Sequence, residues 1–170
     1  MALNLVSPCD ATTDWSTWAG GSLSIDTDDK KEGTGSLKDT VAEPEVDTEY
    51  LTEYSPTGSW DWSAKKHILF WLKSDRKKAD FLIARVQIRD TLNNWRYWNL
   101  TFSAGEWTPI KLLLSTGDVE SGTPPDLALI NHVQVYFRAA DTTPFYKKID
   151  HVRVIGKPQG MIANDYFMYL

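Results

Sequence analysis

Short runs in which apolar and polar residues alternate recur along the whole chain, and turn-forming residues separate them. The run 84–89 is an example, in which Arg85, Gln87 and Arg89 lie between apolar residues. A period of two residues is typical of strands with one buried face, and the 3.6-residue period of amphipathic helices is almost absent. The pattern therefore predicts an all-β protein.

The spacing of these runs predicts a two-sheet antiparallel β-sandwich, a jelly roll of about 8–10 strands, because many short strands with frequent turns are typical of this architecture. The longest irregular stretch, 115–129, is expected to cross from one sheet to the other, with one helical turn at 126–130. No repeat or linker divides the chain, so one domain is expected over 1–155, followed by an apolar tail at 156–170. Strands are expected near 2–7, 21–27, 35–42, 47–54, 66–74, 80–90, 95–102, 107–114, 131–139 and 145–154.

The composition excludes several classes of protein. Of the 170 residues, 42% are hydrophobic, which is enough for one packed core. The formal net charge of −5 lacks the basic excess of a nucleic-acid-binding protein. The apolar runs are far shorter than the ~20 residues of a membrane-spanning helix. Cys9 is the single cysteine, so it cannot form an internal disulfide and is expected as a small buried apolar residue.

Several of the expected strands carry polar and aromatic side chains on their second face. Successive side chains point to opposite faces of a sheet, so packing the apolar sets between two sheets leaves the other sets on an outer surface. Aromatic rings stack on the C–H faces of a pyranose, and guanidinium and amide groups hydrogen-bond its hydroxyls. A glycan-binding site is therefore predicted on this surface. Its candidate residues are Arg85, Gln87, Arg89, Trp95, Tyr97, Asn99, Gln134, Tyr136 and Arg138, with Trp71 on a neighbouring strand.

Two other interpretations of this surface remain open at this stage. Long polar side chains also cover solvated sheet faces, where they discourage pairing between sheet edges. Tyr, Trp and Arg are also the residue types that are enriched in protein–protein interfaces. The residue types alone do not separate a glycan site from these alternatives.

A succession of short motifs supports the same fold. The motifs are Cys9-Asp10, Asp14-Trp15-Ser16, 23–26, 31–38, Trp62-Ser63, 69–74, 105–110 leading into 112–114, and 149–154. In this order and spacing they resemble the β-jelly-roll carbohydrate-binding modules with a galactose-binding-like fold, which are appended to many glycoside hydrolases. The resemblance covers about residues 1–155 and implies non-catalytic glycan binding.

The resemblance also implies a structural Ca²⁺ ion beside the first and last strands. The matching positions are Asp10, Glu32 with the backbone of Gly33, and Asp150. Hard cations take carboxylate and carbonyl oxygens, and glycine lets the backbone turn its carbonyls toward an ion. The alternative is that Asp10 and Asp150 accept hydrogen bonds from loop amides without a metal.

The eight tryptophans divide into three groups. Trp98 and Trp107 are assigned to the core, and Trp15 and Trp62 are expected to close the ends of the sandwich. The tryptophans left as candidates for contact with a ligand are Trp18, Trp60, Trp71 and Trp95.

The C-terminal tail, 156–170, is rich in Met, Tyr and Phe and too apolar to remain in water. It is expected to fold back on its own domain or to dock on a neighbouring subunit. Jelly rolls with docking arms are similar to the decoration, fibre and tail proteins of bacterial viruses. The alternative function is therefore a self-assembling structural subunit of a virion or filament, with copies of itself or virion neighbours as partners. The first residues show no signal-peptide pattern, which predicts cytoplasmic synthesis, and an extracellular location only if a signal has been removed.

An enzyme is not expected. The three histidines lack the spacing of metal ligands, and no motif of a hydrolase nucleophile, a zinc protease or a phosphate-binding loop is present. The acidic pairs Glu43/Glu45 and Glu49/Glu53 could serve a glycosidase only at the carboxylate separation of roughly 5–10 Å that such enzymes need. The sequence therefore predicts a non-catalytic carbohydrate-binding protein whose partner is a polysaccharide or glycan, without a nucleic-acid partner or a membrane span.

Overall fold

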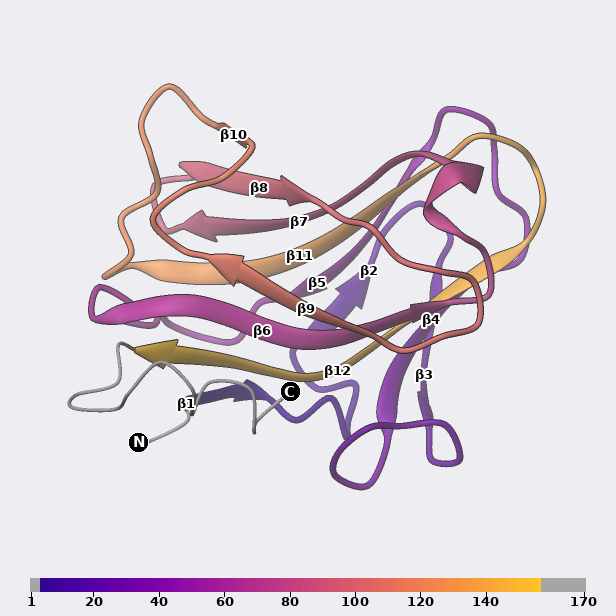
Figure 1. Cartoon of the computed structure of the whole chain (residues 1–170), viewed down its shortest axis with the longest axis horizontal. Coiled ribbons are helices and arrows are strands. Elements are labelled where there is room, and N and C mark those ends of the chain that lie inside the picture. Colours follow the sequence, from indigo (N-terminus) through magenta and orange to yellow (C-terminus); the bar gives the residue numbers. More distant parts are fainter. Residues whose placement is uncertain (1–3, 157–170) are drawn as a thin grey trace.

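The computed structural model describes residues 4–156, which form two antiparallel sheets packed against each other (Figure 1). Sheet A has the order β3-β4-β12-β6-β9, and β1 also pairs with β12; sheet B has the order β10-β8-β7-β11-β5-β2. The strands of sheet A are β1 (Asn4–Ser7), β3 (Ser22–Asp26), β4 (Ser36–Val41), β6 (Lys65–Ser74), β9 (Thr108–Leu113) and β12 (Phe145–Gly156). The strands of sheet B are β2 (Trp15–Thr17), β5 (Glu49–Tyr54), β7 (Phe81–Asp90), β8 (Trp95–Asn99), β10 (Val119–Glu120) and β11 (Ile130–Ala139).

The predicted sandwich is confirmed, and each of the expected strands is present with small shifts of its ends. Two short strands, β2 and β10, were not predicted, because three and two residues are too few for an alternating pattern to be recognised. The expected crossing at 115–129 is also confirmed, since β9 belongs to sheet A and β10 to sheet B. The helical turn expected at 126–130 is wrong. A turn in which Leu129 N–H donates to Asp126 O takes its place, and a short 3₁₀ helix lies instead at η1 (Lys78–Asp80).

The hairpin between β7 and β8 shows how side chains set the turns. The carboxylate of Asp90 accepts hydrogen bonds from the backbone N–H groups of Leu92 and Asn94, both at 2.9 Å. Asn93 adopts a φ of 65°, in the left-handed region that asparagine tolerates better than most residues. This turn fixes the register that places Arg85 opposite Asn99 on the neighbouring strand.

The core lies between the two sheets and is built from the alternating apolar residues of the long strands. Phe137 of β11 is fully buried and packs against Phe81, Phe102 and Phe145, with ring centroids 4.6, 5.2 and 6.2 Å away. These rings come from both sheets and from the segment after β8, so they join the two layers. No helix in residues 4–156 is long and apolar enough to cross a membrane.

The tryptophans confirm part of their predicted roles. Trp15, Trp62 and Trp98 are buried, as expected. The core assignment of Trp107 is wrong, because this residue precedes β9, remains half-buried, and donates its indole N–H to Asp29 Oδ1 at 2.8 Å. Cys9 is fully buried, and burial raises the pKa of its thiol to about 12.

Trp60, one of the candidates for ligand contact, is partly buried and its ring is not freely exposed. Its ring stacks between Tyr54 and Trp62 at centroid distances of 5.8 and 5.4 Å. Trp15 extends this row by packing on Tyr54 at 5.0 Å. The row therefore closes one end of the sandwich.

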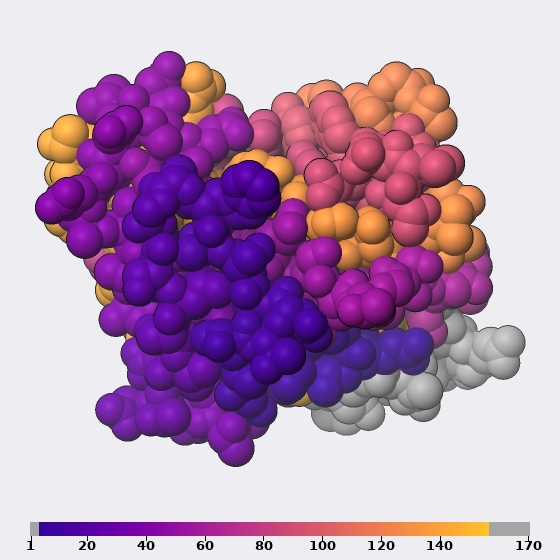
Figure 2. Space-filling model, turned by 180° about the vertical axis from the view of Figure 1, so that it is seen from behind, coloured from indigo at the N-terminus to yellow at the C-terminus, as the bar shows by residue number. Residues whose placement is uncertain are grey.

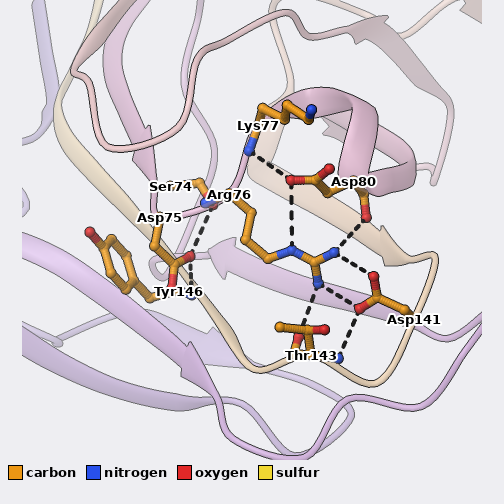
Figure 3. Close-up of polar contacts among 8 residues, drawn as sticks. All are labelled: Ser74, Asp75, Arg76, Lys77, Asp80, Asp141, Thr143 and Tyr146. Carbon is orange, nitrogen blue, oxygen red and sulfur yellow. Dashed lines mark hydrogen bonds and ion pairs between the residues drawn. The ribbon is translucent and has the colours of Figure 1, made fainter.

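Arg76 ties together two segments that each pass from one sheet to the other (Figure 3). Its guanidinium donates two hydrogen bonds to the Asp141 carboxylate, at 2.8 and 2.7 Å. It also donates to the backbone carbonyls of Thr143 and Asp80, at 3.0 and 3.2 Å. The bidentate geometry is the strong form of the arginine–carboxylate pair. The link between β6 and β7 is thus fastened to the link between β11 and β12.

This clamp predicts a contribution to stability that is lost in acid. Hydrogen bonds from Arg76 lower the pKa of Asp141 from 3.8 to about 2. A depressed folded-state pKa stabilises the fold above the unfolded value, and the effect disappears as the pH falls through the folded value. We expect Asp141→Asn to lower the Tm at neutral pH and to flatten its decline between about pH 4 and pH 2, measured by thermal melts.

The control for this experiment is Glu106→Gln, which removes an exposed carboxylate from the turn before β9. It should keep the wild-type pH profile. Identical profiles for wild type and Asp141→Asn would contradict a stabilising role for the clamp.

Candidate functional site

The outer face of sheet B brings the predicted site residues together. Arg85 of β7 lies opposite Tyr136 of β11 and Asn99 of β8. The same registers place Gln87 between Gln134 and Tyr97, and Arg89 beside Trp95. We call this surface the polar-aromatic face. Its predicted members are Arg85, Gln87, Arg89, Trp95, Tyr97, Asn99, Gln134, Tyr136 and Arg138.

The expectation that Trp71 joins this surface is wrong. Trp71 lies on β6, which belongs to sheet A. Its indole N–H donates to Glu32 Oε1 at 3.3 Å, and Lys31 Nζ lies 4.8 Å from the centre of its ring. Alternation gives the face of a strand but not the sheet to which the strand belongs, and this assignment failed for that reason.

A row of hydrogen bonds runs across the middle of the polar-aromatic face. Gln87 Nε2 donates to Gln134 Oε1 at 2.9 Å, and Gln134 Nε2 donates to Glu53 Oε2 on the next strand. The hydroxyl of Tyr136 donates to the same Gln134 oxygen at 3.2 Å. Gln134 is only 2% exposed, so this row holds the floor of the face in place.

The aromatic rings are stacked along the sheet and around one arginine. The guanidinium carbon of Arg85 lies 4.8 Å from the ring centre of Tyr97 and 4.6 Å from that of Tyr136. Trp95 stacks on Tyr97 with centroids 5.6 Å apart and an interplanar angle of 13°. The ring of Tyr97 therefore lies between an indole and a guanidinium. The centre of the face consequently offers polar edges more than open ring faces.

Ion pairs largely balance the charge of the face. Glu49 lies 3.4 Å from Arg85, and Asp47 lies 2.9 Å from Arg138 at the rim. Glu53 lies 3.7 Å from Arg89. The Nε atoms of Arg85 and Arg89 are buried and have no hydrogen-bond partner among residues 4–156.

His132 lies at the same end of the face as this acid–arginine pair. Its Nε2 lies 3.8 Å from Glu53 Oε1. Burial and the nearby Arg89 lower the pKa of His132, against the opposing effect of Glu53. The imidazole is therefore more weakly basic than a free histidine, and at neutral pH it can both donate and accept a hydrogen bond.

Three further residues of the face were not among the predicted site residues. Glu49, Leu51 and Glu53 alternate along β5 with the buried Tyr50 and Thr52. This alternation is visible in the sequence and could have added them. Only the pairing of β5 with β11 shows which surface they share with the arginines.

Trp18, which the sequence left as a candidate for ligand contact, lies at the β2 edge of sheet B. Its backbone N–H donates to Leu51 O at 3.1 Å, which continues the β2–β5 pairing by one residue. The pleat then directs its side chain to the same side as that of Leu51. Trp18 is 61% exposed. Seen from behind, the indigo and purple atoms of the early strands lie beside the pink and orange atoms of the later strands (Figure 2).

The residues implied for calcium hold the loop that precedes β4. Asp10 Oδ1 accepts hydrogen bonds from the N–H groups of Thr34 and Gly35, both at 2.8 Å. Asp150 Oδ2 accepts hydrogen bonds from the N–H groups of Lys31 and Glu32, at 2.6 and 3.0 Å. Both carboxylates therefore bind loop amides, which was the alternative to a metal.

Glu32 and Gly33, the other two residues implied for calcium, also make close contacts in this loop. The Glu32 carboxylate contacts His151 at 3.2 Å and Arg153 at 3.4 Å. Gly33 has a φ of 66°, and a Cβ atom there would lie within 2.7 Å of both Asp10 carboxylate oxygens, so only glycine fits. The loop thus approaches Asp10 as closely as its backbone allows.

Strand β12 also offers one unused acceptor beside this loop. Asp150 Oδ1 is buried and accepts no hydrogen bond from residues 4–156, and burial raises the pKa of this carboxyl. This oxygen is therefore available as a ligand for a cation. Within those residues, however, no group of three or more His, Cys, Asp or Glu side chains could hold a metal ion. Backbone carbonyls would have to supply the remaining ligands.

Comparison with solved structures identifies the fold. The family 11 carbohydrate-binding module from Clostridium thermocellum, in complex with a β-1,3-1,4-mixed-linked tetrasaccharide, is 17% identical with a TM-score of 0.66, over 92% of this chain and 97% of that chain. An exo-β-agarase is 15% identical with a TM-score of 0.68, over 92% of this chain and 25% of its own. A β-1,2-glucanase from Parabacteroides distasonis is 13% identical with a TM-score of 0.61, over 94% and 25%. No family model and no curated protein matches the sequence.

The fold is that of the β-jelly-roll carbohydrate-binding modules, as the order of the motifs predicted. This chain covers almost the whole of the family 11 modules but only a quarter of the agarase and glucanase chains. It is therefore similar in extent to a complete module and to one part of those larger chains.

The calcium prediction can be tested by thermal unfolding. An ion that binds only the folded chain raises the Tm through linkage. We expect a higher Tm in calcium than in EDTA, and we expect Asp150→Asn to abolish the difference. Equal melting curves of the wild type in calcium and in EDTA would contradict the calcium prediction. The hydrogen bonds to the loop amides would then be the whole role of these carboxylates.

Proposed function

We propose that this chain is a non-catalytic glycan-binding module and that the polar-aromatic face of sheet B is its binding site. The observation that carries the proposal is the concentration of guanidinium, amide and aromatic side chains on one sheet face. On sheet A, the loop that carries Lys31 and Glu32 lies against Trp71 and covers part of that ring. The similarity to solved carbohydrate-binding modules supports the class of ligand.

The geometry suits the recognition of hydroxyl groups. Arg85 is held between Tyr97 and Tyr136, so little side-chain freedom is lost when its N–H groups meet a ligand. Gln87 donates one amide hydrogen to Gln134 and keeps its amide oxygen and a second N–H, whereas Gln134 is bonded to Gln87, Tyr136 and Glu53 and supports the floor. Rigid planar groups of this kind fix the orientation of a sugar ring at low entropic cost.

Aromatic side chains at the two sides of the face, one exposed and one partly buried, indicate an extended ligand. Trp18 lies at the β2 edge, and Trp95 lies on β8, four strand spacings away in the order of sheet B. At about 4.8 Å for each spacing, the face measures roughly 20 Å across. This length accommodates several sugar units, so we propose that the ligand is an internal stretch of a polysaccharide.

The acidic residues support binding rather than hydrolysis. Glu49 and Glu53 lie four residues apart on one strand, so their Cα atoms are roughly 13 Å apart. Each also lies beside an arginine. Glu43 and Glu45 are exposed in the loop before β5.

The assembly alternative rests on the tail, and apart from Gly156 the tail lies outside the described residues. No contact of residues 4–156 favours a virion or filament subunit over a binding module. We therefore do not propose the assembly function.

The location of the site can be tested with matched variants. Tyr97→Ala and Tyr136→Ala should each weaken glycan binding by about 2 kcal/mol, or roughly 30-fold in Kd, because each removes a ring that holds Arg85. Trp71→Ala is the control, since it removes a partly buried aromatic side chain from the other sheet. Binding is measured on glycan arrays and then by affinity gels with the polysaccharides found. Full binding by both tyrosine variants would exclude this face.

The extended mode of binding predicts a dependence on ligand length. Trp18→Ala should weaken the binding of long oligosaccharides and leave that of short ones unchanged, as measured by titration calorimetry. Leu92→Ala is the control, because Leu92 is 71% exposed in the β7–β8 hairpin. An equal loss for short and long ligands would contradict a chain that spans the sheet from β2 to β8.

A further inference from the structure

A lysine and an aspartate face each other inside the core of this protein. Lys147 of β12 and Asp39 of β4 are directly opposite in the register of sheet A. Both side chains are completely buried, and Lys147 Nζ lies 3.4 Å from Asp39 Oδ2. Neither residue contributes to the polar-aromatic face, which belongs to the other sheet.

A buried ion pair does not explain this arrangement well. Removing two charges from water costs more than their attraction returns unless further hydrogen bonds satisfy every polar atom. Lys147 Nζ donates to Tyr50 O at 2.6 Å and lies 5.4 Å from the centre of the Phe137 ring. Asp39 Oδ1, however, is buried and accepts no hydrogen bond within residues 4–156. Such an unsatisfied atom in a core calls for an explanation.

The two oxygens of the Asp39 carboxyl group have different surroundings. Oδ2 accepts hydrogen bonds from the hydroxyls of Thr17 and Thr52, at 2.9 and 2.6 Å. Oδ1 faces Gly21, where a Cβ atom would lie 2.5 Å from this oxygen. Two hydroxyl donors therefore hold Oδ2 and can stabilise negative charge on it. Oδ1 accepts no hydrogen bond within residues 4–156 and can serve as the leaving group.

A fraction of the Lys147 amine has the neutral form that can react with a carboxyl group. Burial lowers the pKa of Lys147 to about 8, against the opposing effect of Asp39. A larger fraction of the amine is therefore neutral at neutral pH than for an exposed lysine, and only the neutral amine is a nucleophile. The fold also holds the two groups together permanently, which supplies the proximity that a condensation needs.

We propose that Lys147 and Asp39 condense into an intramolecular amide bond that joins β12 to β4. The lone pair of Nζ attacks Cγ of Asp39, and the hydroxyls of Thr17 and Thr52 stabilise the charge on Oδ2 in the tetrahedral intermediate. The Cγ–Oδ1 bond then breaks. Counted from the ammonium and carboxylate forms, two protons of the nitrogen leave with Oδ1 as one water molecule. No oxidant, reductant or further reactant is needed.

The test is the intact mass of the full chain, measured after denaturation in acid. We expect a mass that is lower than the sequence mass by one water molecule. After digestion, we expect one branched peptide that contains both Lys147 and Asp39. The full sequence mass without a branched peptide, in protein that has been incubated in the folded state, would overturn the proposal.

Two variants make the test specific to this pair. Lys147→Arg keeps a positive charge but has no primary amine, so it should show the full sequence mass. Asp39→Asn should form the same bond with the loss of ammonia in place of water. A water loss that persists in Lys147→Arg would overturn the assignment to this pair. The wild-type mass decides the question even if neither variant folds.

Discussion

The apolar layer between the two sheets is the interaction on which the rest of this structure depends. Neighbouring side chains in a strand point to opposite faces, so burying Val86 and Ile88 forces Arg85, Gln87 and Arg89 to the outside of the same strand. The polar-aromatic face is therefore a direct consequence of the core. The backbone positions of the face are fixed by the sheet, because the strands that carry the face also carry the packing residues.

Polar groups inside and on this sandwich are organised by hydrogen bonds from several strands. Gln134 connects β7, β11 and β5, and Arg76 connects the two links between the sheets. The pair of Lys147 and Asp39 differs from these, because one of its oxygens has no partner within the described chain. An unsatisfied oxygen beside a buried amine, in a pair that the register of sheet A holds together, points to chemistry rather than to packing.

A fold shared at 17% identity with a carbohydrate-binding module shows how little of the fold depends on particular side chains. The alternating pattern and the turn residues are sufficient to define two sheets, and many different apolar residues can fill the layer between them. A binding function depends on individual residues at one surface. The proposal for this chain therefore rests on Arg85 and its two tyrosines more than on the resemblance of the whole domain.

The sequence by itself determined the strands, the sandwich and the side of each strand on which a residue lies, because these follow from a period of two residues. For this reason it placed Arg85, Tyr97 and Tyr136 on the outward side of their strands. Tertiary structure alone decided which strands share a sheet, and this separated Trp71 from the site and added Glu53 to it. It also decided that Lys147 meets Asp39, since the pairing of β12 with β4 joins residues far apart in the chain, and no local pattern records which distant strands will pair.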